Sequence, residues 1–244
     1  MNTDNSTNYF DPCQSVAKKI FTLLCFSLCL CVSVADVDFM NDITQTTLPH
    51  KDYAGAKLGM WLFLFTEILL FGGLFLVYSV YRSMYPQDFH EAAAGLSTVL
   101  GTVNTLILLT SSLTMALSIS ALRRGNSRRS VLLQAATIVF GLVFLVNKYF
   151  EWSGHIHEGL YPNAPELLSR SHGEILFYGL YYVMTGLHGL HVVVGLVLIG
   201  IMLALTSRQR ITGADHVKLE NAGLYWHLVD LIWIYLFPLF YLIT

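Results

Sequence analysis

Five long stretches of apolar residues alternate with short polar connections along the 244 residues of this chain. A transmembrane helix needs about 20 consecutive apolar residues, and each of the five stretches is long enough. The pattern therefore predicts an all-α membrane protein, a multi-pass bundle of five transmembrane helices. The expected spans are residues 58–81, 96–122, 131–152, 175–206 and 222–244.

Composition supports this class, because 55% of the residues are hydrophobic and only 12% are charged. A soluble domain of this length would carry more charge. The formal net charge of −2 gives no sign of a nucleic-acid partner, since such partners require a basic surface.

Basic residues in the connections predict the orientation, because cytoplasmic connections carry the excess of lysine and arginine. If the spans alternate, the connections on one side hold these basic residues: Lys51, Lys57, Arg123, Arg124, Arg128, Arg129, Arg208, Arg210 and Lys218. The opposite connections, 82–95 and 153–174, hold few basic and several acidic residues. We therefore expect the N-terminal side of the first span in the cytoplasm and the C-terminus outside.

The segment before residue 50 does not fit this scheme. An apolar run at 20–34 follows Lys18 and Lys19 and resembles a secretory signal, yet a crossing there would invert every later span. We therefore divide the chain into an extension, residues 1–50, and a transmembrane domain, residues 51–244. We expect that synthesis starts at Met40 or that residues 1–39 do not cross. All four cysteines lie in the extension, so no disulfide or cysteine metal site is predicted for the rest: Cys13, Cys25, Cys29 and Cys31.

A few ionisable residues interrupt the spans, where a charge is costly and marks either a function or a satisfied structural bond. Glu67 lies near the middle of the first span. Water-free surroundings favour the neutral acid at that depth unless a cation pairs with it. Glu67 is therefore either a group that handles protons or ions, or a protonated carboxyl group that is hydrogen-bonded to a neighbouring helix.

Two histidines of the fourth span, His188 and His191, stand three residues apart and share one helical face. With His227 of the fifth span they could bind a metal. A closed metal site needs more ligands, and the spans contain no Glu-x-x-His pair. We therefore favour histidines that bond helices or contact lipid, and we predict no metal site and no catalytic residue.

The fifth span carries His227 and Asp230, again three residues apart. Asp230 could orient the His227 ring as a carboxylate orients a metal ligand, or the two side chains could simply satisfy each other. Tyr225, Trp226 and Trp233 beside them are interpreted as packing residues or as anchors at the membrane interface.

Lys148 and Glu151 lie near the outer end of the third span, where their spacing allows an ion pair on one helical face. The lysine stem is expected to extend outward so that its ammonium group reaches water. His155, His157 and His172 follow in the expected loop and are interpreted as surface histidines.

Several motifs, taken in their order along residues 50–244, resemble subunit III of the haem-copper cytochrome oxidases in its short, five-span bacterial form. They are Lys57-Leu-Gly-Met60-Trp-Leu-Phe63 with Thr66-Glu67, Asn104-Thr105, Ser111-Ser112, the stretch 148–152, Thr185-Gly-Leu-His188-Gly-Leu-His191-Val192, and Glu220-Asn-Ala-Gly-Leu-Tyr-Trp-His227-Leu-Val-Asp230-Leu-Ile-Trp233.

The resemblance implies an accessory subunit of a proton-pumping terminal oxidase in the bacterial plasma (inner) membrane. Haem and copper would be bound by its partners, oxidase subunits I and II, and phospholipid by this chain. The subunit would support assembly, proton uptake and sustained turnover. Glu67 matches the family's carbodiimide-reactive carboxyl group. The other polar residues are expected to contact lipid or to bond helices: His188, His191, Glu220, His227 and Asp230.

Three alternatives stay open at this point. A homologous accessory protein of bacterial nitric oxide reductases shares the five spans and the glutamate motif. An independent transporter would also place a glutamate in mid-span, although no inverted repeat is visible. A membrane metalloenzyme would require a stoichiometric transition metal in the isolated chain.

Overall fold

The computed structural model describes residues 53–213 and 215–243. The predictions for the N-terminal extension, including its cysteines, the apolar run and the start at Met40, lie outside these residues. The helices are α2 (Tyr53–Met84), α3 (Pro86–Ala94), α4 (Thr98–Arg123), α5 (Ser127–His157), α6 (Pro165–Leu168), α7 (His172–Ser207) and α8 (Val217–Tyr241).

Five of these helices are long and apolar enough to cross a membrane, which confirms the predicted class. The helices extend past most of the predicted ends, and α5 begins four residues before the expected 131–152 and ends five residues after it. The extra turns carry polar residues, so the apolar pattern marks the part of a helix that crosses the hydrocarbon core and not the whole helix.

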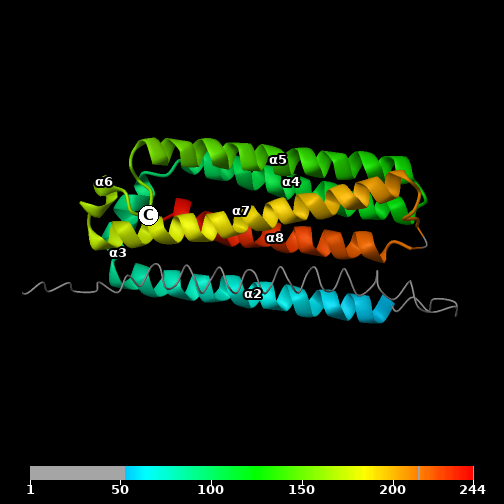
Figure 1. Cartoon of the computed structure of the whole chain (residues 1–244), viewed down its shortest axis with the longest axis horizontal. Helices are drawn as coiled ribbons and strands as arrows, with labels where there is room; N and C mark the ends of the chain where they lie inside the picture. Colours follow the sequence, from blue (N-terminus) through cyan, green and yellow to red (C-terminus); the bar gives the residue numbers. More distant parts are fainter. Residues whose placement is uncertain (1–52, 214, 244) are drawn as a thin grey trace, which may run out of the picture. The chain divides into compact units, whose positions relative to one another are not determined.

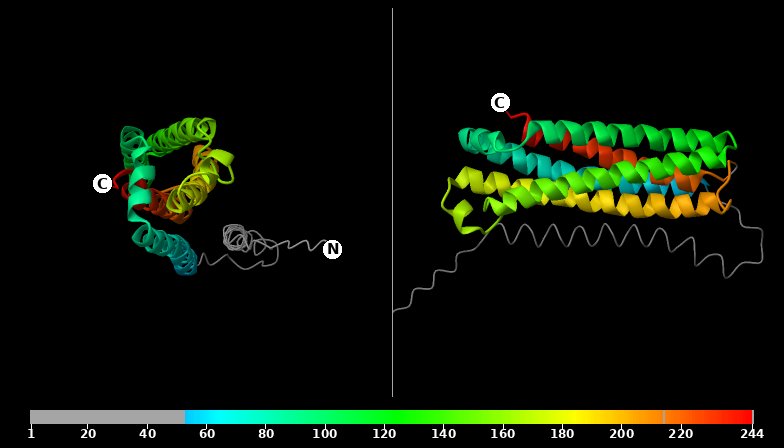
Figure 2. Two further views of the ribbon diagram at one scale, coloured as in Figure 1. Left: turned by 90° about the vertical axis from the view of Figure 1, so that its left-hand side faces the viewer. Right: turned by 90° about the horizontal axis from the view of Figure 1, so that it is seen from above.

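The long helices run side by side (Figure 1), and α4, α5, α7 and α8 form a bundle when viewed end-on (Figure 2). Helix α2 lies to one side, where it packs on α7 and α8. Helix α8 is the most enclosed span, with 50% of its most apolar window buried against 28% for each of the others. The aromatic and polar residues of α8 therefore form much of the protein interior.

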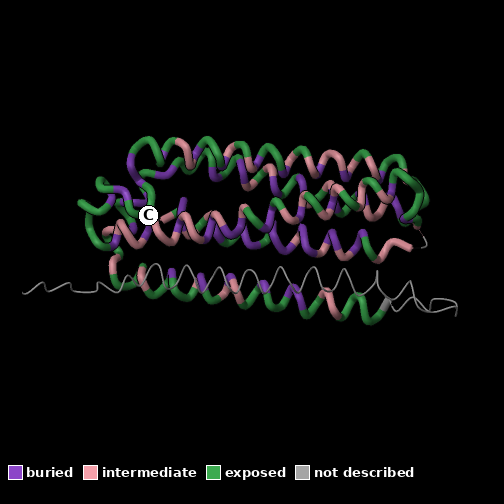
Figure 3. Tube along the Cα trace, in the orientation of Figure 1, coloured by how far each residue is buried: buried purple, intermediate pink, exposed green. Residues whose placement is uncertain are grey.

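Helix α2 has one buried side and one exposed apolar side. Its buried residues recur along one side (Figure 3): Phe63, Leu64, Glu67, Phe71, Leu74 and Tyr78. Large apolar side chains cover the remaining surface, and Trp61, Phe65 and Leu69 are each more than half exposed. A surface of this kind suits lipid or a partner subunit better than water.

The connections that hold the basic residues meet at one end of the bundle. Glu220 at the start of α8 forms ion pairs with Lys57 of α2 and Arg123 of α4. Ser127 at the start of α5 donates a hydrogen bond to Gln209, just after α7. The spans therefore alternate in direction, as the parity argument required.

Short helices occupy the connections at the opposite end. Pro86 begins α3 within the connection 82–95, and Pro165 begins α6 within 153–174. Proline suits a first helical turn, because the amide hydrogen that it lacks would have no partner there. Asp88 of α3 accepts a hydrogen bond from the backbone N–H of Gly173 at 3.0 Å, which holds α3 against the start of α7.

Candidate functional site

The buried carboxyl group of Glu67 bonds directly to α7. Glu67 lies near the middle of α2, on its buried side. Its Oε2 atom lies 2.9 Å from Nε2 of His191. The ring of Phe71 packs edge-on against the His191 imidazole, and Tyr225 stacks beside it. The two polar groups are thus enclosed by aromatic residues, and the mid-span glutamate has a hydrogen-bond partner on a neighbouring helix.

The hydrogen-bond partners of the two His191 ring nitrogens indicate where the hydrogens of the Glu67–His191 pair lie. Its Nδ1 atom lies 2.8 Å from the backbone oxygen of Leu187, which can only accept, so Nδ1 carries a hydrogen and donates it. Nε2 then either accepts a hydrogen from a neutral Glu67 or, as part of an imidazolium, donates one to a carboxylate. In both forms a single proton is shared between Glu67 and His191.

His188 has a different environment, although it shares a helical face with His191. It is fully buried, and neither ring nitrogen has a hydrogen-bond partner among the described residues. Its ring packs edge-on against Phe144 at 5.6 Å and beside Trp233 at 5.2 Å. Among the described residues His188 therefore makes no interhelical hydrogen bond, and its ring packs between aromatic side chains.

The proposed pairing of Asp230 with His227 is also wrong. Nδ1 of His227 bonds to the hydroxyl group of Ser112 on α4, at 2.6 Å. The carboxyl group of Asp230 is buried beside the same serine, but neither of its oxygens makes a hydrogen bond of normal geometry in the described part of the chain. The hydrogen-bond partner of His227 therefore lies on another helix, α4.

The tryptophans of α8 pack in the protein interior and do not anchor the helix at the interface. Trp226 and Trp233 are fully buried, and their indole N–H groups donate to Ser111 and Thr105 of α4. Trp226 fits against glycine, since a Cβ atom at Gly195 of α7 would lie 2.8 Å from its ring. Aromatic rings and hydroxyl groups thus join α8 to its neighbours.

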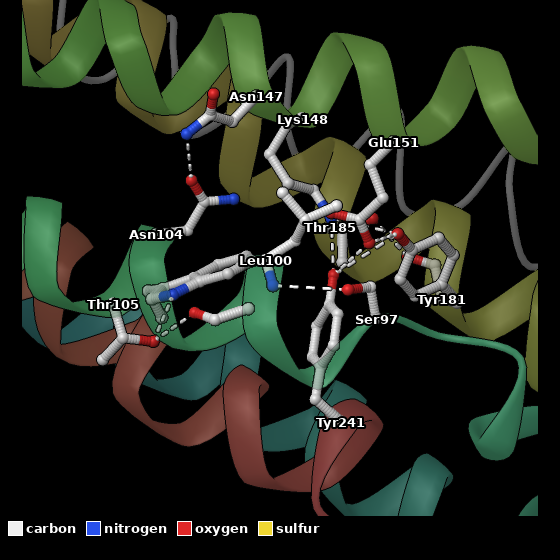
Figure 4. A network of polar contacts seen from close by, with 12 residues as sticks. Ser97, Leu100, Asn104, Thr105, Asn147, Lys148, Glu151, Tyr181, Thr185 and Tyr241 are labelled. Carbon is white, nitrogen blue, oxygen red and sulfur yellow. Dashed lines mark hydrogen bonds and ion pairs between the residues drawn. The ribbon is translucent and has the colours of Figure 1, made fainter.

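A second buried polar network lies toward the α3 and α6 end (Figure 4). Lys148 and Glu151 of α5 form the predicted ion pair, with Nζ and Oε2 3.3 Å apart. The ammonium group also donates to the hydroxyl groups of Tyr181 on α7, at 3.0 Å, and Tyr241 on α8, at 2.9 Å. Both tyrosines in turn donate to Oε1 of Glu151. One ion pair and two phenols therefore connect three helices.

The expectation that Lys148 extends outward to water is wrong, because its side chain is only 9% exposed. The aromatic rings of Tyr181, Trp233 and Tyr241 surround the ammonium group at 4.9, 5.3 and 5.6 Å, and cation–π attraction replaces part of its lost hydration. His155 was expected in a surface loop. It lies instead on the last turns of α5 and is buried.

Glu220 is the centre of a third polar group, at the basic end of the bundle. It pairs with Lys57 at 3.1 Å and with Arg123, and Nε2 of His216 lies 3.0 Å from it. The sequence motif identified Glu220 but not these partners. The pairs tie the starts of α2 and α8 to the end of α4.

Sequence reasoning found the acidic and basic members of these networks and missed the hydroxyl groups. Ser112, Tyr181 and Tyr241 carry no charge and are common in membrane spans, so no local pattern distinguishes them. The one available signal was the Ser111-Ser112 pair, which stood among the motifs without an assigned role.

The fold and these networks define a class: a polytopic membrane protein whose buried polar groups bond one helix to another. His191 and His227 bond to different groups, and His188 packs between aromatic rings. The described residues contain no group of three or more His, Cys, Asp or Glu side chains that could hold a metal ion. Residues 9–244 match the sequence family described as cytochrome c oxidase subunit III, and the chain belongs to this family. It is accordingly an accessory subunit of a haem-copper oxidase complex.

The individual relatives are also named as subunits 3 of oxidases. Proteins named cytochrome c oxidase subunit 3 from Synechocystis sp. and Thermostichus vulcanus are 37% and 34% identical to the chain. The alignments cover 83% and 80% of this chain and 84% and 90% of those proteins. Quinol oxidase subunit 3 from Bacillus spizizenii is 31% identical over 76% of this chain and 85% of that protein. These comparisons give no support to the nitric oxide reductase alternative.

Proposed function

We propose that this chain binds beside subunits I and II of a proton-pumping terminal oxidase in a bacterial plasma membrane. There it supports assembly, phospholipid binding, proton uptake and sustained turnover, and it contains no active site of its own. Its basic end faces the cytoplasm, because lysine and arginine concentrate in cytoplasmic connections.

The observation that carries the role in proton uptake is the hydrogen bond between Glu67 and His191. In the proposed role this bond holds a proton near the middle of a membrane span, where ionisable groups are costly to bury and mark proton or ion pathways. A purely apolar pair would pack the two helices at lower cost, so the presence of a titratable pair at this depth favours a function.

The surroundings of the span histidines support the proposal that haem and copper belong to the partner subunits. His191 and His227 each direct ring nitrogens to neighbouring side-chain or backbone groups, and His188 lies between aromatic rings. Among the described residues no hydrogen bond joins any two of these histidines. The electron donor is then determined by the partners, and the named relatives include subunits of both cytochrome c oxidases and quinol oxidases.

A groove between α2 and α8 supports phospholipid binding. It has a volume of about 560 Å³, and its walls include Phe75, Tyr235 and Leu239. Arg82 lies at the edge of this groove, near the end of α2. Apolar walls suit an acyl chain, and a guanidinium group suits a phosphate.

Purification in mild detergent tests the proposal. We expect the chain to copurify with larger haem-bearing subunits, identified by mass spectrometry and by the visible spectrum of the complex. Stoichiometric haem or copper in the isolated chain would contradict an accessory role. Protease access to the α6 connection, from one side of intact cells, tests the orientation.

A further inference from the structure

We propose that water and protons reach the buried Lys148–Glu151 pair from the α6 end of the bundle, and that His155 is the relay on this route. The pair then acts as a site that takes up and releases a proton. This inference concerns the end opposite the basic connections and does not depend on the role of Glu67.

Three ionisable residues follow one another along one face of α5. His155 lies one turn beyond Glu151, and Glu158 caps the helix three residues later. Side chains at such spacings are neighbours on a helix surface. Exposure rises toward the end, because the Glu151 side chain is 3% exposed, that of His155 9%, and that of Glu158 68%. The three residues thus lead from the buried ion pair to the surface.

His155 is a buried imidazole that lacks hydrogen-bond partners. In the described part of the chain neither ring nitrogen has a hydrogen-bond partner. The rings of Tyr178 and Tyr181 pack around it at 6.3 and 6.0 Å. Nδ1 is 3.9 Å from Oε2 of Glu158, which is too long for a direct hydrogen bond.

Other polar atoms in the same region also lack partners. They are the indole N–H of Trp152 and the hydroxyl group of Tyr182, whose rings lie 5.2 Å apart, and Oε2 of Glu151, which contacts Lys148 without a well-aligned hydrogen bond. Buried polar atoms in native proteins are almost always bonded, either to protein or to ordered water. Their clustering between α5 and α7 therefore points to a hydrated region.

The Lys148–Glu151 pair can hold an extra proton because groups other than Glu151 also stabilise the Lys148 ammonium group. A proton that reaches Glu151 neutralises the carboxylate and leaves Lys148 without its counter-charge. Two phenol oxygens and three aromatic rings still stabilise the ammonium group. Neutral imidazole can accept a proton at one nitrogen and release one from the other, which suits His155 to the transfer.

Several other titratable groups lie around His155 and Glu151 and influence a proton on this route. They are Lys148 and Glu158 from α5 and its cap, Tyr178, Tyr181 and Tyr182 from α7, and Tyr241 from α8. Only Lys148 among them adds positive charge, and Glu158 attracts a proton toward the entrance.

Cysteine accessibility in the assembled complex tests for water at His155. The four native cysteines are changed to serine, and single cysteines replace His155, Ile156 or His157. Ile156 is 50% exposed on the apolar surface, and His157 is exposed at the helix end. Vesicles that hold the complex in one orientation are treated with Ag⁺ from one side, and protection of each thiol from later alkylation is measured by mass spectrometry.

We expect His155→Cys to react at least about tenfold faster than Ile156→Cys, because thiolate is the reactive form and needs a polar environment. Reaction should occur from the α6 side and be slower than that of His157→Cys. Equal rates for positions 155 and 156, or reaction of position 155 from the basic end alone, would overturn the proposal.

A measurement on the wild-type complex covers the case in which His155→Cys fails to assemble. Infrared spectra in D₂O, with ring-labelled tyrosine and Tyr181→Phe to assign the band, follow deuteration of the Tyr181 hydroxyl group. We expect rapid exchange in the wild type, slowed at least about tenfold by His155→Phe because the imidazole relay is gone. His157→Phe is the matched control and should exchange like the wild type. A Tyr181 band that stays undeuterated for hours in the wild type, or equal rates in the two phenylalanine variants, would contradict the route.

Discussion

Replacement of Glu67 by glutamine or alanine separates a proton-handling role from a structural one. Glutamine keeps the shape of the side chain. Its amide N–H can donate to Nε2 of His191 while Nδ1 still donates to Leu187, so the interhelical bond survives without a titratable proton. Alanine removes the hydrogen-bond partner of Nε2 of His191.

The stability loss expected for Glu67→Ala depends on whether the Glu67–His191 pair is neutral or ionised. If Glu67 is neutral, Glu67→Ala leaves one buried acceptor unsatisfied, which costs about 1–3 kcal/mol. If the pair is ionised, the same change leaves an uncompensated buried cation and costs about 3–5 kcal/mol. We expect Glu67→Gln to be nearly neutral in stability, because the hydrogen bond to His191 is kept.

The loss of stability in the two variants is measured by thermal unfolding of the complex and by the fraction of this subunit that stays bound to it. A hydrophobic carbodiimide, which attacks protonated buried carboxyl groups, should label Glu67 in preference to other acids. Proton release and turnover lifetime in vesicles measure the function, where we expect a partial defect in Glu67→Gln. A Glu67→Gln variant that pumps protons as the wild type does, with the same turnover lifetime, would show that Glu67 is structural. Complete loss of oxygen reduction in the fully assembled glutamine variant would refute the accessory role.

Three further substitutions test packing and bonding. Gly195→Ala should destabilise the bundle by about 1–3 kcal/mol through a clash with a buried tryptophan, whereas Gly200→Ala on the same helix meets no atom within 4 Å and should be silent in thermal unfolding. His227→Ala should weaken subunit retention by about 1–3 kcal/mol, because Ser112 loses its partner; retention equal to the wild type would contradict this. His188→Phe should cost less than about 1.5 kcal/mol, since aromatic packing is kept and no hydrogen bond to the described residues is lost. An altered haem spectrum in an intact complex would show that His188 acts on a cofactor.

The apolar pattern alone determined the class and the number of spans, and the basic residues of the connections predicted how the spans alternate. Burial of a backbone in lipid requires helices, and each helix must be long enough to cross, so length and composition were sufficient. The same reasoning located Glu67 in mid-span and paired Lys148 with Glu151, because residues three apart on one helix are neighbours in any packing.

Only the tertiary structure decided which polar groups meet across helices. Glu67 and His191 are 124 residues apart, and Ser112 and His227 are 115 apart. A soluble helix reveals its inward face by its apolar stripe, but a lipid-exposed helix such as α2 is apolar on its outer side as well. The rotation of each span is set instead by close packing and interhelical hydrogen bonds. For that reason the burial of Lys148 and His155, and the failure of Asp230 to pair with His227, depended on contacts that no single span contains.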